Sequence, residues 1–147
     1  MKSRLFAHCI ELAKTKVQSL KSELESTRES TTSEGKSTAG DKHETGRAMM
    51  HLEQEKLHKQ LAEAQAIVAA FERIESSVDH DSVQVGAIVQ TQRATFLLAV
   101  GLGKIHFEDK DYFVVSPESP VAKQMMGKKV GEHFAVNGRE YVITAID

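Results

Sequence analysis

Two acidic side chains, Asp41 and Glu44, stand three residues apart at the start of a helical pattern. Residues at this spacing lie on the same face of a helix. Two carboxylates on one face can bind a divalent ion such as Mg²⁺ together with its waters, because Mg²⁺ commonly takes only one or two protein carboxylates. The spacing is also that of a helix-capping box, and the helix dipole favours acids in a first turn. The two interpretations are compatible, since a capped first turn would hold both carboxylates rigidly.

Histidines are further candidate ligands near this acidic pair. His43 lies between the two acids, and His51, Glu55 and His58 follow the i, i+4, i+7 spacing of a metal site on one helix face. Such a triple arises readily on a charged helix. We therefore expect His51, Glu55 and His58 to be ordinary surface residues, and His43 to lie in solvent at the end of a loop.

Two helical segments must position the acidic pair. Apolar residues alternate at steps of four and three over residues 6–24, and a similar spacing returns over residues 50–71. Both patterns predict a coiled-coil seam, with a second helix running from about Asp41 to about Glu75. Residues 29–40 between the seams are rich in Ser, Thr and Gly, which favour turns. We predict an antiparallel helical hairpin; an intermolecular coiled coil is the alternative.

The second half of the chain has a different period. The helical pattern stops after residue 76, and β-branched and apolar residues then predict strands at 83–91, 95–100, 112–115, 133–136 and 140–146. Asn137-Gly138 predicts a hairpin between the last two strands, and Pro120 and Gly127 bound a short helix. The predicted fold class is α+β: a helical hairpin over 1–76, a linker over 77–82, and a small antiparallel sheet domain with one short helix over 83–147.

Composition excludes several classes of protein. The chain has 147 residues, a formal net charge of −2 and a single cysteine, Cys9, so it has no intramolecular disulfide and no cysteine-based zinc site. The charge count shows no basic stripe of the kind that phosphate-binding proteins carry. No segment has the apolar length of a signal peptide or a membrane span. We expect a cytoplasmic protein with no membrane partner and no sequence-specific DNA binding.

One segment of the second half resembles a known family. The residues Ser116-Pro-Glu-Ser-Pro-Val-Ala-Lys-Gln-Met-Met-Gly-Lys-Lys-Val-Gly131 are similar to the C-terminal signature of the bacterial Gre factors, in which a Ser-Pro opens a helix and a Gly-Lys-Lys-Val-Gly stretch leads into the last two strands. The similarity covers roughly residues 83–147. It implies an FKBP-like domain that docks on the rim of the RNA polymerase secondary channel.

The acidic pair extends the resemblance into the hairpin. Gre factors have a Gly-Asp, two further residues and a Glu at the turn into the second hairpin helix, and Gly40, Asp41 and Glu44 match that pattern. The next residues differ: the family usually continues Asn-Ala-acid-Tyr, whereas this chain has Thr45-Gly46-Arg47-Ala48.

The resemblance implies a transcription elongation factor that is not an enzyme by itself. Asp41 and Glu44 would complete the polymerase's own site, sharing its Mg²⁺ and stimulating cleavage of backtracked transcripts; the factor would have no cofactor of its own and would act as a monomer. The expected partner is bacterial RNA polymerase, with indirect contact to the nascent RNA 3′ end. Candidate partner-binding residues are Lys42, Arg47, Lys128 and Lys129.

Three alternatives remain open. The altered stretch 45–48 favours a regulator of the same shape that occupies the secondary channel without cleavage. An FKBP-like prolyl isomerase or chaperone is a second alternative, although we expect no aromatic-lined pocket from the few aromatic residues of this half. A coiled-coil adaptor is the third.

Overall fold

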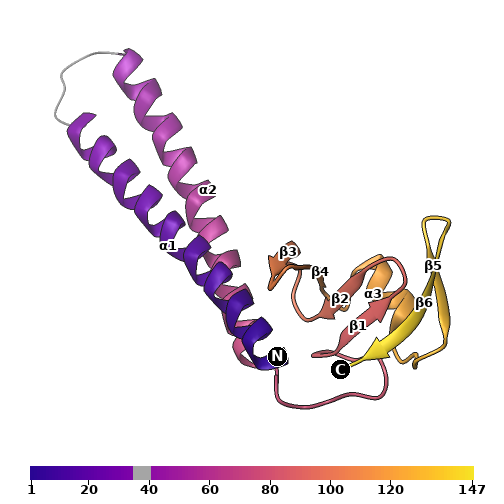
Figure 1. Ribbon diagram of the computed structural model, residues 1–147. Coiled ribbons are helices and arrows are strands. Elements are labelled where there is room, and N and C mark those ends of the chain that lie inside the picture. Colours follow the sequence, from indigo (N-terminus) through magenta and orange to yellow (C-terminus); the bar gives the residue numbers. More distant parts are fainter. Residues whose placement is uncertain (35–40) are drawn as a thin grey trace. The chain divides into compact units, whose positions relative to one another are not determined.

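The computed structural model describes the backbone of residues 1–34 and 41–147, and the side chains of residues 1–28 and 46–147. The described residues form two compact units, one of residues 11–68 and the other of residues 1–10 with 69–147. Helices α1 (Lys2–Glu34) and α2 (Asp41–Glu72) precede all the strands (Figure 1). Within the described residues, no helix is long and apolar enough to cross a membrane.

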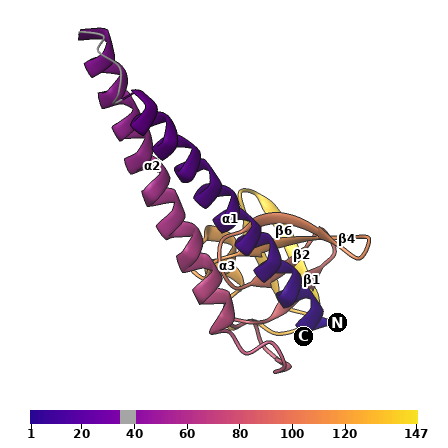
Figure 2. The ribbon, with the colours of Figure 1, turned by 90° about the vertical axis from the view of Figure 1, so that its left-hand side faces the viewer.

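The unit of residues 11–68 is a helical hairpin. Segments of α1 and α2 lie side by side in both views (Figure 2). The buried residues follow a seven-residue period on each helix, with Ala13 and Leu20 on α1 and Leu57 and Ala64 on α2. A seven-residue period keeps the apolar seam facing the partner helix. The two seams therefore close on each other within one chain, and the predicted hairpin is confirmed.

The helices end at different residues from those expected. The first helix continues through residues 29–34, which the sequence assigned to the loop, and α2 ends at Glu72 rather than near Glu75. A hydroxyl can bond to the carbonyl one turn earlier in a helix, as the Thr27 Oγ1 does to the Glu23 oxygen at 2.9 Å. A Ser/Thr-rich stretch is therefore compatible with helix when a paired helix already supports it. Near the start of α1, Phe6 contacts Phe71 of α2, with ring centroids 6.2 Å apart.

Cys9, in the unit of residues 1–10 and 69–147, is fully buried. Burial raises the pKa of the Cys9 thiol from 9.0 to about 11, because the thiolate would lose its hydration. Only the thiolate is nucleophilic, so at about pH 8 the reactive fraction falls about 100-fold. We expect a maleimide to modify the native protein at least about 100-fold more slowly than the guanidinium-unfolded chain. Equal labelling rates in the two states would contradict the buried position.

The second unit also holds a mixed sheet with the strand order β3-β4-β2-β1-β6-β5. The elements are β1 (Ile88–Thr91), β2 (Thr95–Leu98), β3 (Gly103–Phe107), β4 (Lys110–Val115), α3 (Pro120–Met125), β5 (His133–Val136) and β6 (Arg139–Ile146). Strands β2 and β4 pair in parallel, and the other pairs are antiparallel. The α+β fold class with one short helix is confirmed, and the sheet is mixed rather than wholly antiparallel.

Strand β3 was missing from the sequence-based prediction. It is an edge strand whose one buried residue is Ile105, while Lys104 and His106 are exposed. Polar side chains are typical of edge strands, because they oppose pairing with other chains. The turn into β4 uses Glu108 and Asp109, both with positive φ, without the glycine that usually marks such a turn. The predicted Asn137-Gly138 turn is present, with φ values of 52° and 77°.

Strand β1 begins at Ile88 rather than at residue 83. Gly86 has a φ of +97°, which side-chain-bearing residues rarely adopt, and it turns the chain before the strand. A Cβ there would lie 3.3 Å from both His80 Nε2 and Ile74 Cγ2. The glycine therefore allows the segment after α2 to pack closely against the start of the sheet.

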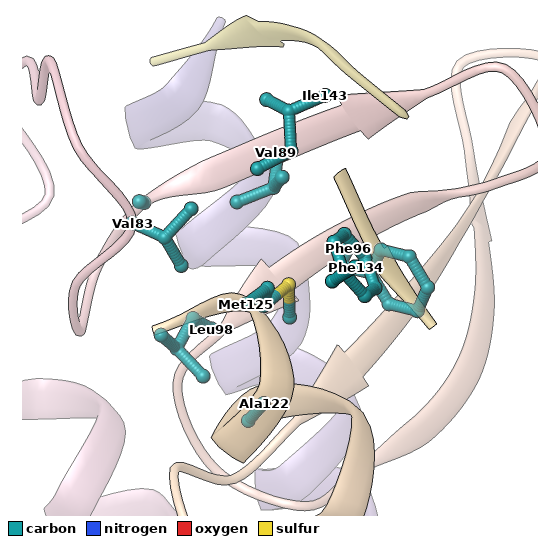
Figure 3. Packing of buried hydrophobic residues seen from close by; sticks show 9 residues of the cluster. Val83, Val89, Phe96, Leu98, Ala122, Met125, Phe134 and Ile143 are labelled. Atoms are coloured by element: carbon teal, nitrogen blue, oxygen red, sulfur yellow. The ribbon is translucent and has the colours of Figure 1, made fainter. Parts of the chain in front are cut away.

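The core of this unit lies between the sheet and α3 (Figure 3). Helix α3 contributes Ala122 and Met125, which are fully buried against side chains from several strands. The labelled core residues are Val83, Val89, Phe96, Leu98, Ala122, Met125, Phe134 and Ile143. This packing fixes α3 and the loops on either side of it, which contain the family-like signature.

Candidate functional site

The acidic pair lies where the hairpin helices meet their connection. Helix α1 ends at Glu34 and α2 begins at Asp41, so Asp41 and Glu44 lie in the first turn of α2. The backbone thus has the helical spacing that brings both residues to one face. The side chains of Asp41, Lys42, His43 and Glu44 lie outside the described residues, as does Gly40. The capping and metal-binding interpretations of the pair therefore stay predictions.

The chemistry of the donor set suits Mg²⁺. Two carboxylates match the one or two that Mg²⁺ usually takes from a protein, with water filling the remaining positions. The alternative set, His51, Glu55 and His58, is solvent-exposed along α2. Among the side chains that the structure describes, no group of three or more His, Cys, Asp or Glu is arranged to hold a metal ion. The three side chains are exposed on the surface of α2, as the sequence predicted.

The other predicted partner-binding residues fall in two places. Arg47 is half-buried on α2, and Lys42 precedes it in the first turn. Lys128 and Lys129 follow α3, and both contact Glu132: Lys128 Nζ lies 4.0 Å from Oε2, and the Lys129 N–H donates to Oε1 at 3.2 Å. Glu132 therefore holds the two lysines in a defined turn on the surface of the sheet domain.

The family-like signature forms a capped short helix followed by turns. Ser119 caps α3: its Oγ accepts from the Ala122 N–H at 3.3 Å and donates to the Ser116 carbonyl at 2.7 Å. Gly127 and Gly131 have φ values of 78° and 92°, and their N–H groups donate to Val83 and Ile143 at 2.8 Å. The spacing of these residues thus has a local cause: Ser119 supplies the helix cap, Pro120 stands in the first turn, and the two glycines supply left-handed turns.

The sheet domain contains an aromatic-lined hollow that the sequence did not reveal. Phe96 and Phe113 are register partners on β2 and β4, and Tyr141 on β6 packs edge-on against Phe96. With Arg93 and Arg139, they line a hollow of about 540 Å³. The expectation that too few aromatic residues are available was wrong, because strand pairing gathers residues that are far apart in the sequence. These side chains point to an apolar contact surface with two cations beside it.

Comparison with known proteins gives a match in structure. No protein-family model matches the chain, and no curated protein sequence matches it. The crystal structure of GreA factor homolog 1 (Gfh1) of Thermus thermophilus is 15% identical over 94% of each chain, with a TM-score of 0.40. A second structure, of the transcription factor Gfh1, is 14% identical over 94% of this chain and 92% of that one, with a TM-score of 0.39.

Proposed function

We propose that this chain is a Gre-type accessory factor of bacterial RNA polymerase that enters the secondary channel and stimulates cleavage of backtracked transcripts. The observation that carries the proposal is the start of α2 at Asp41, which puts Asp41 and Glu44 in one helical turn beside the hairpin connection. The signature from Ser116 to Gly131 supports the same family, since its serine, proline and glycines occupy the cap and turn positions that the pattern requires.

The proposed role of the hairpin is to present two carboxylates to the polymerase. A polymerase with no incoming nucleotide binds its second Mg²⁺ weakly, and Asp41 and Glu44 would strengthen that site. The ion, when bound, would stabilise charge on the oxygens of the reacting phosphodiester. The hairpin's own contribution is positional: the seam around Leu20, Leu57 and Ala64 packs α2 against α1.

A binding and cleavage experiment tests this function. We expect the purified protein to retain bacterial RNA polymerase in a pull-down, and to shorten the RNA of stalled, backtracked complexes when Mg²⁺ is present. Omitting Mg²⁺ should remove the cleavage and leave binding unchanged, since the sheet domain supplies most of the proposed docking surface. A protein that binds the polymerase but never shortens the transcript contradicts the cleavage role, and absence of binding contradicts the whole proposal.

The second candidate is a secondary-channel regulator without cleavage activity. The stretch 45–48 favours it, because Arg47 and Ala48 stand on α2 where the family usually has an acid and a tyrosine, and Gly46 lies inside the helix. A glycine within a helix costs about 1 kcal/mol relative to alanine and weakens the turn next to the acidic pair. A transcription assay separates the two candidates: a regulator of this kind lowers RNA synthesis, whereas a cleavage factor restores elongation of arrested complexes.

A further inference from the structure

One flank of the hairpin carries a line of cations. Lys14, Lys21 and Arg28 stand seven residues apart on α1, and the first two follow the buried seam residues Ala13 and Leu20 directly. Seven residues are almost two helical turns, so the three side chains form a straight row with a rise of about 10.5 Å between neighbours. Acidic residues elsewhere in the chain outnumber the basic ones and give a net charge of −2. A count of charges therefore does not reveal this row.

The row borders a groove with an apolar floor. Two adjoining hollows, of about 490 and 320 Å³, lie along this flank and share Lys21 as a lining residue. The apolar residues that line the first hollow and the second are Leu24 and the pair Val17 and Val68, respectively. These three residues are only half-buried, whereas four other seam residues are buried, namely Ala13, Leu20, Leu57 and Ala64. Pairing of α1 with α2 thus leaves part of the seam uncovered on this side.

The α2 edge of the groove contributes Gln54, His58 and Gln65. Glu25 is the one acid among the residues that line these two hollows, against the three cations. The hollow that involves the other side of the hairpin differs, since its lining of Ser26, Thr27, Met49, Met50 and Glu53 contains no cation. The cations that line these three hollows are therefore all found in the two that share Lys21.

We propose that this groove, defined by Val17, Leu24 and Val68 with the row Lys14, Lys21 and Arg28, docks an acidic amphipathic helix of a partner protein. Apolar residues of that helix would cover the exposed part of the seam, as a third helix does in a helix-in-groove complex. A partner helix repeats every seven residues, so its carboxylates have the same spacing as the three cations. This contact lies along the hairpin and involves neither Asp41 nor Glu44.

The composition of the hairpin favours a protein partner over single-stranded RNA. Binding of single strands combines cations with aromatic side chains on which the bases stack. Residues 11–68 contain no Phe, Tyr or Trp, so the hairpin offers no stacking platform. Its floor is aliphatic, which suits leucine or isoleucine side chains of a helix.

The test uses a synthetic peptide of about three heptads, with leucines on one face and flanking glutamates whose repulsion keeps it monomeric. A matched peptide has lysines in place of the glutamates. We expect the acidic peptide to bind the full-length protein in a calorimetric titration and the lysine peptide to bind at least 10-fold more weakly. The K21Q/R28Q double variant should weaken acidic-peptide binding at least 10-fold, while K21R retains it.

Controls separate this groove from general charge attraction. The K16Q/K56Q variant removes the same charge from exposed lysines that line neither hollow and should leave peptide binding unchanged. Circular dichroism must show equal helix content in all variants. Equal binding of the two peptides, no loss in K21Q/R28Q, displacement of the peptide by single-stranded RNA, or self-association through the groove in sedimentation would each overturn the proposal.

Discussion

Replacing Asp41 by Asn or Glu44 by Gln is expected to remove stimulated transcript cleavage while the melting temperature stays nearly unchanged. Each substitution keeps the size of the side chain and removes the charge that a divalent ion requires. Loss of one electrostatic contact at a reacting centre typically lowers the rate on the order of 100-fold or more. Gel analysis of RNA from backtracked complexes, at a fixed Mg²⁺ concentration, measures the effect directly.

The same substitutions distinguish a metal-binding role from a helix cap. Asn caps a helix as well as Asp does, so Asp41→Asn should preserve a cap, whereas Asp41→Ala would lose about 1 kcal/mol of helix stability. Loss of the favourable charge–dipole interaction costs only about 0.3–1 kcal/mol. If capping were the sole role, the Asn variant would cleave normally and the Ala variant would melt earlier.

A matched control lies further along the same helix. Glu55→Gln removes one exposed carboxylate from α2 outside its first turn and should change neither cleavage nor stability. Polymerase binding should also persist in all these variants, because the proposed docking residues of the sheet domain are untouched. Equal loss of cleavage in Glu55→Gln would mean that the net charge of the hairpin, rather than the Asp41–Glu44 pair, controls activity.

The hairpin could be predicted because its signal is local. A seven-residue apolar period places Ala13, Leu20, Leu57 and Ala64 at the seam, and this period can be read without knowing how distant parts of the chain fold. The row Lys14, Lys21 and Arg28 has the same period, but total charge conceals it because acids elsewhere compensate. Reading charges by helical position rather than by count would have revealed the basic flank from the sequence.

The sheet was harder to predict because its pairing is non-local. The parallel pairing of Phe96 with Phe113 has no signature within either strand, and the aromatic hollow follows from that register. Edge strand β3 alternates polar and apolar residues only from Lys104 to Phe107, and the turn that follows it has no glycine, so its sequence signal is short and lacks the usual turn marker. The family-like signature was predictable because Ser119, Pro120 and the glycines act on their own backbone.

The largest loss of stability is expected from Phe71→Ala. Phe71 and Phe6 are 1% and 2% exposed, and their rings meet edge to face at 6.2 Å. Removing a buried phenylalanine typically costs about 3–5 kcal/mol, because burial energy is lost and a cavity remains. That is a large fraction of the free energy of unfolding of a typical folded protein, which is roughly 5–15 kcal/mol. Urea denaturation followed by far-ultraviolet circular dichroism measures the change.

Leu52→Ala provides the matched control on the same helix. Leu52 is 65% exposed, so its truncation should change the unfolding free energy by no more than about 0.5 kcal/mol. A double-mutant cycle of Phe6→Leu with Phe71→Leu should give a coupling of about 0.5–1.5 kcal/mol, the value of an aromatic pair beyond its buried area. A similar, small loss in Phe71→Ala and Leu52→Ala would mean that the base of the hairpin is not packed through this ring. In that case the contact between Phe6 and Phe71 would not be what holds the start of α1 against the end of α2.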